Sequence, residues 1–100
     1  LINAQTNTTY TYVLGDANKW VSFNNASAVT VTVPANSTVA FPVGTQIEGV
    51  QLGAGQVTFT GAGGVTVRNV PGLKIAAQYG VYGLMKIATD EWVLYGRLSA

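Results

Sequence analysis

The stretch that decides the fold is Val29-Thr30-Val31-Thr32-Val33, which is followed directly by Pro34. Apolar and polar side chains alternate here with a period of two, and in a β-strand successive side chains point to opposite faces of the sheet. The alternation predicts a strand whose three valines face a core and whose two threonines face outward. Pro34 is expected to end the strand because proline lacks the backbone N–H that a sheet ladder needs.

Similar alternation recurs along the chain, and turns rich in glycine, asparagine and aspartate interrupt it. No window of a dozen residues shows the three-four spacing of an amphipathic helix. Gly49 interrupts one of the expected strands and predicts a β-bulge, and the glycine loop at 61–64 predicts a hairpin between its two flanking strands. Strands are expected at residues 9–14, 19–23, 28–33, 38–41, 45–52, 56–60, 65–68, 73–77, 80–88 and 91–98.

Short strands at a spacing of about 8–12 residues are typical of sandwiches and barrels. The sequence therefore predicts one all-β domain over residues 1–100, either an antiparallel β-sandwich of the jelly-roll type or a small barrel. A β-solenoid stays open as an alternative. Residues 29–34 only faintly echo residues 65–68, however, and no fixed repeat length is visible, so the sandwich is preferred.

Composition excludes several classes of partner. Charged residues make up 9% of the chain, against roughly 25% in ordinary soluble domains, and the net charge is +1. Phosphate binding needs clustered lysine or arginine, so no nucleic-acid partner is expected. No apolar run approaches the ~20 residues of a spanning helix, so membrane insertion is not expected either. The basic residues are scattered along the chain: Lys19, Arg68, Lys74, Lys86 and Arg97.

The sequence contains few of the residue types that carry out catalysis. There is no histidine and no cysteine, which excludes a Ser-His-Asp triad, a thiolate nucleophile and the usual zinc ligands. The carboxylates are Asp16, Glu48, Asp90 and Glu91, and the side chains of the adjacent pair are expected to diverge rather than form a glycosidase dyad. The glycine loops lack the lysine and serine or threonine of a phosphate loop. We therefore expect no enzyme activity, no catalytic residues, no cofactor and no metal.

The aromatic residues are expected mainly in the core or at a subunit interface. In the C-terminal strand, Trp92 and Leu94 share one face while Tyr95 lies on the other, and both faces are largely apolar. A strand buried on two sides has this pattern, so Trp92, Leu94 and Tyr95 are predicted to form a subunit interface. Tyr79 and Tyr82 flank Gly80 in an expected loop and are the best candidates for exposed rings that stack on a glycan.

Five segments of the chain resemble, in the same order and over nearly its whole length, a domain that recurs in structural proteins of tailed bacteriophages. Such domains occur in predicted tail fibres, head fibres and other virion surface proteins. The segments are Ile2-Asn3-Ala4-Gln5-Thr6 with Thr8-Thr9-Tyr10-Thr11, residues 24–34, Phe41-Pro42-Val43-Gly44-Thr45, residues 50–59, and Thr89-Asp90-Glu91-Trp92-Val93-Leu94.

The resemblance implies a non-enzymatic homotrimeric module on the virion surface, either a fibre domain or a capsid decoration (cement) domain, assembled in the host cytoplasm. Its partners would be other capsid or tail proteins. The alternative is the tip domain of a tail fibre that binds a host cell-surface glycan. The start at Leu1, without a methionine, is expected to mark the ordered part of a longer virion protein. The resemblance supplies no catalytic or ligand-binding residues.

Overall fold

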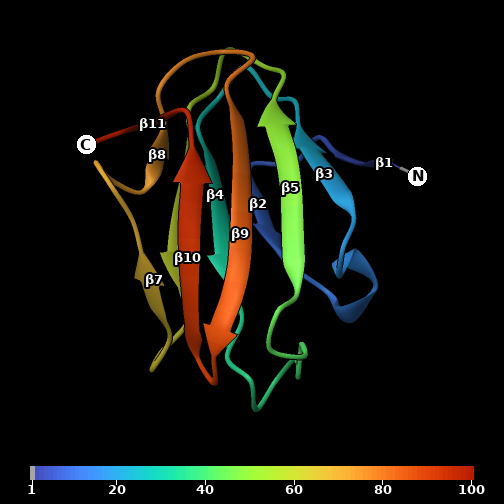
Figure 1. The fold of residues 1–100 in the computed structure, drawn as a ribbon. Helices are drawn as coiled ribbons and strands as arrows, with labels where there is room; N and C mark the ends of the chain where they lie inside the picture. Colours follow the sequence, from blue (N-terminus) through green and yellow to red (C-terminus); the bar gives the residue numbers. More distant parts are fainter. Residues whose placement is uncertain (1) are drawn as a thin grey trace.

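The structure is a computed structural model and describes residues 2–100 as an all-β chain with a single short 3-10 turn at Leu14–Asp16 (Figure 1). Within this described part no helix is long and apolar enough to cross a membrane. The strands are β1 (Ile2–Gln5), β2 (Thr9–Thr11), β3 (Trp20–Phe23), β4 (Val29–Val33), β5 (Gln46–Gln51), β6 (Val57–Gly61), β7 (Thr66–Arg68), β8 (Lys74–Ile75), β9 (Val81–Ala88), β10 (Glu91–Gly96) and β11 (Leu98–Ser99).

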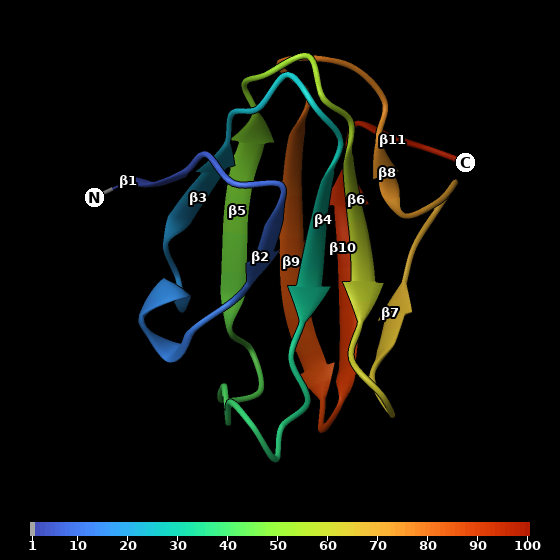
Figure 2. The same ribbon diagram turned by 180° about the vertical axis from the view of Figure 1, so that it is seen from behind.

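These strands form two sheets that pack face to face. The six-stranded sheet has the order β1-β3-β5-β9-β10-β7, and the five-stranded sheet has the order β11-β8-β6-β4-β2. Figure 1 views the molecule from the side of the six-stranded sheet, and Figure 2 shows the five-stranded sheet from behind. Strands β1 and β11 lie at opposite sides of the molecule in both views.

The first six strands wind as stacked coils. Odd-numbered strands go to one sheet and even-numbered strands to the other, and each pairs in parallel with the strand one coil earlier. Trp20 pairs with Glu48 and Val29 with Val57, an offset of 28 residues in both sheets. This is solenoid-like stacking, because each coil hydrogen-bonds to its neighbour through both of its strands.

The corners between the sheets stack as well as the strands do. Asn25 donates from its side chain to the carbonyl of Thr6 at 2.8 Å, and its own carbonyl accepts the backbone N–H of Gly55 at 2.8 Å. A Cβ atom on Gly55 would collide with the carbonyl of Ser27. The corner therefore needs glycine where one coil lies directly on the next.

The last part of the chain departs from the coil pattern. β9 pairs antiparallel with β5 and β10, and β8 pairs antiparallel with β6 and β11, while β7 pairs parallel with β10. The predicted all-β class and its two layers are confirmed. The predicted wholly antiparallel arrangement is wrong, because the strands of the N-terminal coils pair in parallel.

The core lies between the two sheets. Val29, Val31 and Val33 are buried as the alternation predicts, with Thr30 exposed. Phe59 packs 4.8 Å from the ring of Tyr82, and Phe41 meets Trp92 edge-on at 5.5 Å, both measured between ring centroids. The other buried hydrophobic residues are Tyr12, Val21, Phe23, Ile47, Val57, Ile75, Leu84, Leu94 and Leu98.

Three local predictions are wrong. Residues 38–41 form no strand but belong to a loop whose Phe41 is buried. β6 and β7 do not form a hairpin, because the loop at 61–64 carries the chain from one sheet to the other. Gly49 is not bulged: it pairs in register with Val21 and Tyr82, and a Cβ atom there would collide with the Val21 carbonyl. The irregular register lies instead between Glu91 and Trp92.

Candidate functional site

The outer face of the five-stranded sheet carries threonine. Thr9, Thr30 and Thr58 occupy one row across three paired strands, and Thr11, Thr32 and Thr60 occupy the next row. Threonine suits a solvated strand because its branched Cβ favours the extended backbone while its hydroxyl group stays hydrated. This face is an uncharged polar surface, and Lys74 extends its first row on β8.

The outer face of the six-stranded sheet is mostly apolar, and we call it the apolar sheet face. Its residues alternate along their strands with the buried ones, so they point away from the core. Val81, Ile87 and Tyr95 are 49%, 43% and 40% exposed, which is unusual for large apolar side chains on one sheet. The large apolar members of this face are Ile2, Trp20, Val50, Val81, Met85, Ile87, Val93 and Tyr95.

Tyr95 lies flat across the middle of the apolar sheet face. A Cβ atom on Gly83, its register partner on β9, would collide with the Tyr95 ring. The Tyr95 hydroxyl lies 3.4 Å from Oε2 of Glu48, two strands away. Partial burial, and then the negative charge of Glu48, raise the pKa of Tyr95. The ring thus covers the backbone of β9 and presents one side to solvent.

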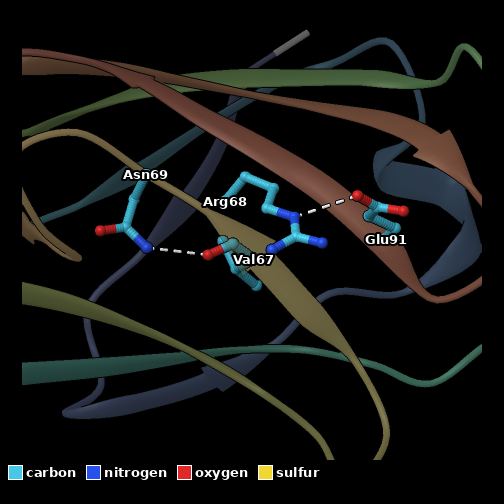
Figure 3. Close-up of polar contacts among 4 residues, drawn as sticks. All are labelled: Val67, Arg68, Asn69 and Glu91. Atoms are coloured by element: carbon cyan, nitrogen blue, oxygen red, sulfur yellow. Dashed lines mark hydrogen bonds and ion pairs between the residues drawn. The ribbon is translucent and has the colours of Figure 1, made fainter.

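One margin of this face contains a shallow groove of about 370 Å³, lined by Arg68, Asn69, Val70, Val93, Leu94, Tyr95 and Gly96. Figure 3 shows the Arg68 guanidinium directed toward Glu91, with Nε 3.0 Å from Oε2, while Asn69 turns away to donate to the carbonyl of Val67 at 2.8 Å. Val70 is 84% exposed. Because Arg68 and Glu91 already pair with each other, the groove presents apolar surface rather than an unpaired charge.

The structure changes the predicted subunit interface. Trp92 and Leu94 are buried in the core of their own chain, at 1% and 2% exposure, so they cannot contact a partner without unfolding. The strand is buried on one face only, because Tyr95 on its other face is exposed. Of the three residues predicted for an interface, Tyr95 alone is available for contact.

The two tyrosines predicted to contact a glycan, Tyr79 and Tyr82, do not lie on one surface. Tyr79 is 67% exposed, in a left-handed backbone conformation at φ 70°. Beside it lies a hollow of about 360 Å³ lined by Ala77, Gln78, Tyr79, Gly80, Val81 and Arg97. Tyr82 is buried instead, donating its hydroxyl to the carbonyl of Val21 at 3.0 Å and accepting the Tyr12 hydroxyl at 2.8 Å. The prediction that Tyr82 is exposed is therefore wrong.

The carboxylates are held apart by separate partners. Asp90 accepts the backbone N–H of Asn36 at 2.7 Å, while Glu91 pairs with Arg68, so the two neighbours diverge as expected. Glu48 faces outward beside Tyr95. Residues 2–100 contain no group of three or more histidine, cysteine, aspartate or glutamate side chains that could hold a metal ion.

Asp16 belongs to a polar cluster that closes the N-terminal end of the core. Its carboxylate accepts the Tyr10 hydroxyl at 2.6 Å, the Asn3 side-chain amide at 2.9 Å and the backbone N–H of Val13 at 3.0 Å. Partial burial, with the adjacent Asp16, raises the pKa of Tyr10 to about 12. A hydrogen-bonded polar layer at the end of a stacked fold shields its core from solvent, as terminal repeats do in solenoids. No pattern in the sequence indicated this cluster.

A second polar cluster that the sequence did not reveal surrounds Lys86. This lysine points into the protein from β9 and is 2% exposed. Its Nζ donates to Oδ1 of Asn36 at 2.6 Å and to the carbonyl of Phe41 at 2.7 Å. Both acceptors lie in the loop between β4 and β5, so the lysine fixes that loop against the sheet.

Comparison with known proteins found no relative: no protein-family model, no curated protein and no solved structure matches this chain. What the domain does must therefore be argued from its own surfaces.

Proposed function

We propose that this domain is a non-enzymatic structural module that assembles with copies of itself through the apolar sheet face. The observation that carries the proposal is the contrast between its two outer faces. One is lined by threonine hydroxyls, whereas the other exposes valine, isoleucine, methionine and tyrosine side chains. Contiguous apolar surface of this kind is typical of protein–protein contact sites.

The dimensions of the molecule suit such a contact. Its two longer extents are 32 and 28 Å, which gives a face on the order of the ~800 Å² per partner that stable interfaces bury. Charge does not oppose self-association, because the net charge is +1 and the Arg68–Glu91 pair is internally neutralised. A second copy is the occupant that this largely apolar face favours, with the one outward carboxylate of β5, Glu48, lying beside the Tyr95 hydroxyl.

The setting we propose is the surface of a tailed-phage particle, as a trimeric fibre or capsid decoration domain in contact with other capsid or tail proteins. This rests on the resemblance of the segments from Ile2 to Leu94 to phage structural proteins. A stacked-coil domain with few charges and no cysteine fits a rigid extracellular part, and association would add stability by mass action.

A second candidate function is glycan binding at the hollow beside Tyr79. An exposed aromatic ring next to Gln78 and Arg97 offers a stacking surface with hydrogen-bond donors around it. A glycan array probed with the wild-type domain and with Tyr79→Ala tests it. Binding that the substitution abolishes would support a receptor-binding tip, and no binding by the wild type would remove this candidate.

The assembly surface is tested by placing charge on it. Val81→Lys puts an ammonium group on the apolar sheet face, at the start of the inner strand β9, where desolvating it against a second copy is unfavourable. We expect the mass measured by sedimentation velocity to fall to the 10.4 kDa of one chain, with unchanged circular dichroism. Thr30→Lys, on the opposite outer face, is the matched control and should leave the assembly intact. If both variants assemble like the wild type, the apolar sheet face is not the interface.

A further inference from the structure

The side-chain partner of the buried lysine is a side-chain amide rather than a counter-ion. Lys86 Nζ lies 2.6 Å from Oδ1 of Asn36, and these residues are 50 positions apart in the sequence. No ion pair to Lys86 occurs within residues 2–100, where the Arg68–Glu91 pair stands alone. The amine is therefore held against the side-chain amide of Asn36 and the carbonyl of Phe41, with no carboxylate paired to it, and a lysine amine in contact with a carbonyl group can act as a nucleophile.

Aromatic side chains pack around the buried Lys86, while Asn36 is half-buried. Trp92 on β10 is the register partner of Lys86, and Phe41, whose carbonyl accepts from Lys86, packs edge-on against the Trp92 ring. Both rings are buried, at 2% and 1% exposure. A site that holds an amine against a carboxamide brings two reactants together at a high effective concentration.

A carboxylate completes the arrangement. Asp90 Oδ1 accepts the backbone N–H of Asn36 at 2.7 Å, so an acid–base group contacts the same residue as the amine does. Asp90 sits in the turn between β9 and β10 with φ 57°, a conformation that aspartate and asparagine adopt more readily than most residues. Lysine, asparagine and aspartate thus converge from β9, from the loop after β4 and from the turn after β9.

We propose that Lys86 and Asn36 join in an intramolecular isopeptide bond, assisted by Asp90. The neutral Lys86 amine attacks Cγ of Asn36, and a bond forms between Nζ and Cγ. The bond between Cγ and Nδ2 then breaks, and Nδ2 leaves as ammonia after taking a proton from the attacking amine through the Asp90 carboxylate. In sum, a lysine amine and a side-chain amide give a secondary amide and ammonia. No oxidant and no co-reactant is needed.

The bond would tie the long loop between β4 and β5 covalently to the middle of the six-stranded sheet. The cross-link would join residues 50 positions apart. Closing a loop of this length restricts the unfolded chain more than the folded one, so the bond stabilises the fold. It would give a cysteine-free domain a covalent brace that does not depend on the redox conditions of its surroundings.

The intact mass of the purified wild-type chain tests the proposal. We expect it to be lighter than the sequence mass by one ammonia molecule. Trypsin should then fail to cleave after Lys86 and should release residues 20–68 joined to residues 75–97. A folded chain at its full sequence mass would overturn the proposal, and so would loss of ammonia without that branched peptide.

Variants separate the chemistry from folding. Asp90→Asn keeps the hydrogen-bond acceptor and tolerates the same backbone conformation, so the chain should fold but keep its full mass. Glu91→Gln, the matched control at the neighbouring carboxylate, should still form the branched peptide. Asn36→Asp should reach the same final mass as the linked wild type by losing water instead of ammonia. A branched peptide from Asp90→Asn in the same yield as from the wild type would exclude the role given to Asp90.

Discussion

Gly49→Ala is expected to destabilise the domain strongly. Gly49 lies on β5 between β3 and β9, where a Cβ atom would collide with the backbone carbonyl of Val21 and come within 2.8 Å of the Tyr82 ring. Because the Val21 obstacle is backbone in a paired strand, it cannot move aside as a flexible side chain can. Overpacking typically costs about 1–3 kcal/mol and occasionally more, and an obstacle of paired backbone places Gly49→Ala at the upper end, a large part of the stability of a small domain.

The measurement is urea unfolding followed by tryptophan fluorescence, since Trp92 is buried in the core. Gly63→Ala is the matched control, because a Cβ atom at Gly63 meets nothing within 4 Å. Its unfolding free energy should stay within about 0.5 kcal/mol of the wild type, as for most surface substitutions. Equal stability of the Gly49→Ala and Gly63→Ala variants would contradict the close approach of β3 and β5 described above.

Alkaline pH is expected to destabilise the domain steeply from about pH 10 upward. Burial raises the pKa of Tyr12 and the pKa of Tyr82 well above 10.0, and the neighbouring Tyr82 hydroxyl raises the pKa of Tyr12 further. Partial burial beside Asp16 raises the pKa of Tyr10 to about 12. The folded state holds these phenols neutral, whereas the unfolded chain ionises near pH 10. Their contribution is therefore complete below pH 10 and is lost as pH rises, by about 1.4 kcal/mol per pH unit for each tyrosine.

Tyr12→Phe isolates one of these groups. It removes a buried hydroxyl but leaves Tyr82 donating to the carbonyl of Val21, so the fold should survive. We expect the free energy of unfolding, measured with urea at steps from pH 9 to pH 11.5, to fall less steeply than in the wild type by about 1.4 kcal/mol per pH unit. Parallel slopes in the two proteins would show that the Tyr12 hydroxyl is not shielded in the folded state.

The strands were largely predictable from the sequence, but their partners were not. Alternation tells which side chains of β4 face the core, and the burial of Val29, Val31 and Val33 follows. It does not tell whether the neighbouring strand runs parallel or antiparallel, since both place alternate side chains on one face. The coils also differ in length: Ile2 pairs with Trp20, 18 residues on, whereas Trp20 pairs with Glu48, 28 residues on. Unequal coils conceal the repeat that identifies a solenoid.

The candidate sites were harder to predict for the same reason. Tyr79 and Tyr82 are three residues apart, yet one is exposed and the other is buried, because β9 begins between them. Lys86 and Asn36 look like ordinary surface residues in the sequence, and only the fold of the loop between β4 and β5 brings them together. The apolar sheet face is assembled from β1, β3, β5, β9 and β10, so no single segment could reveal it.

The most direct test of the proposed function is the mass of the wild-type domain in solution, measured by light scattering on a size-exclusion column. Self-assembly through the apolar sheet face as a trimer predicts a particle of three times the 10.4 kDa chain mass, persisting on dilution to micromolar concentration. A particle of one chain mass at every concentration would contradict the proposal and leave the hollow beside Tyr79 as the surface to explore.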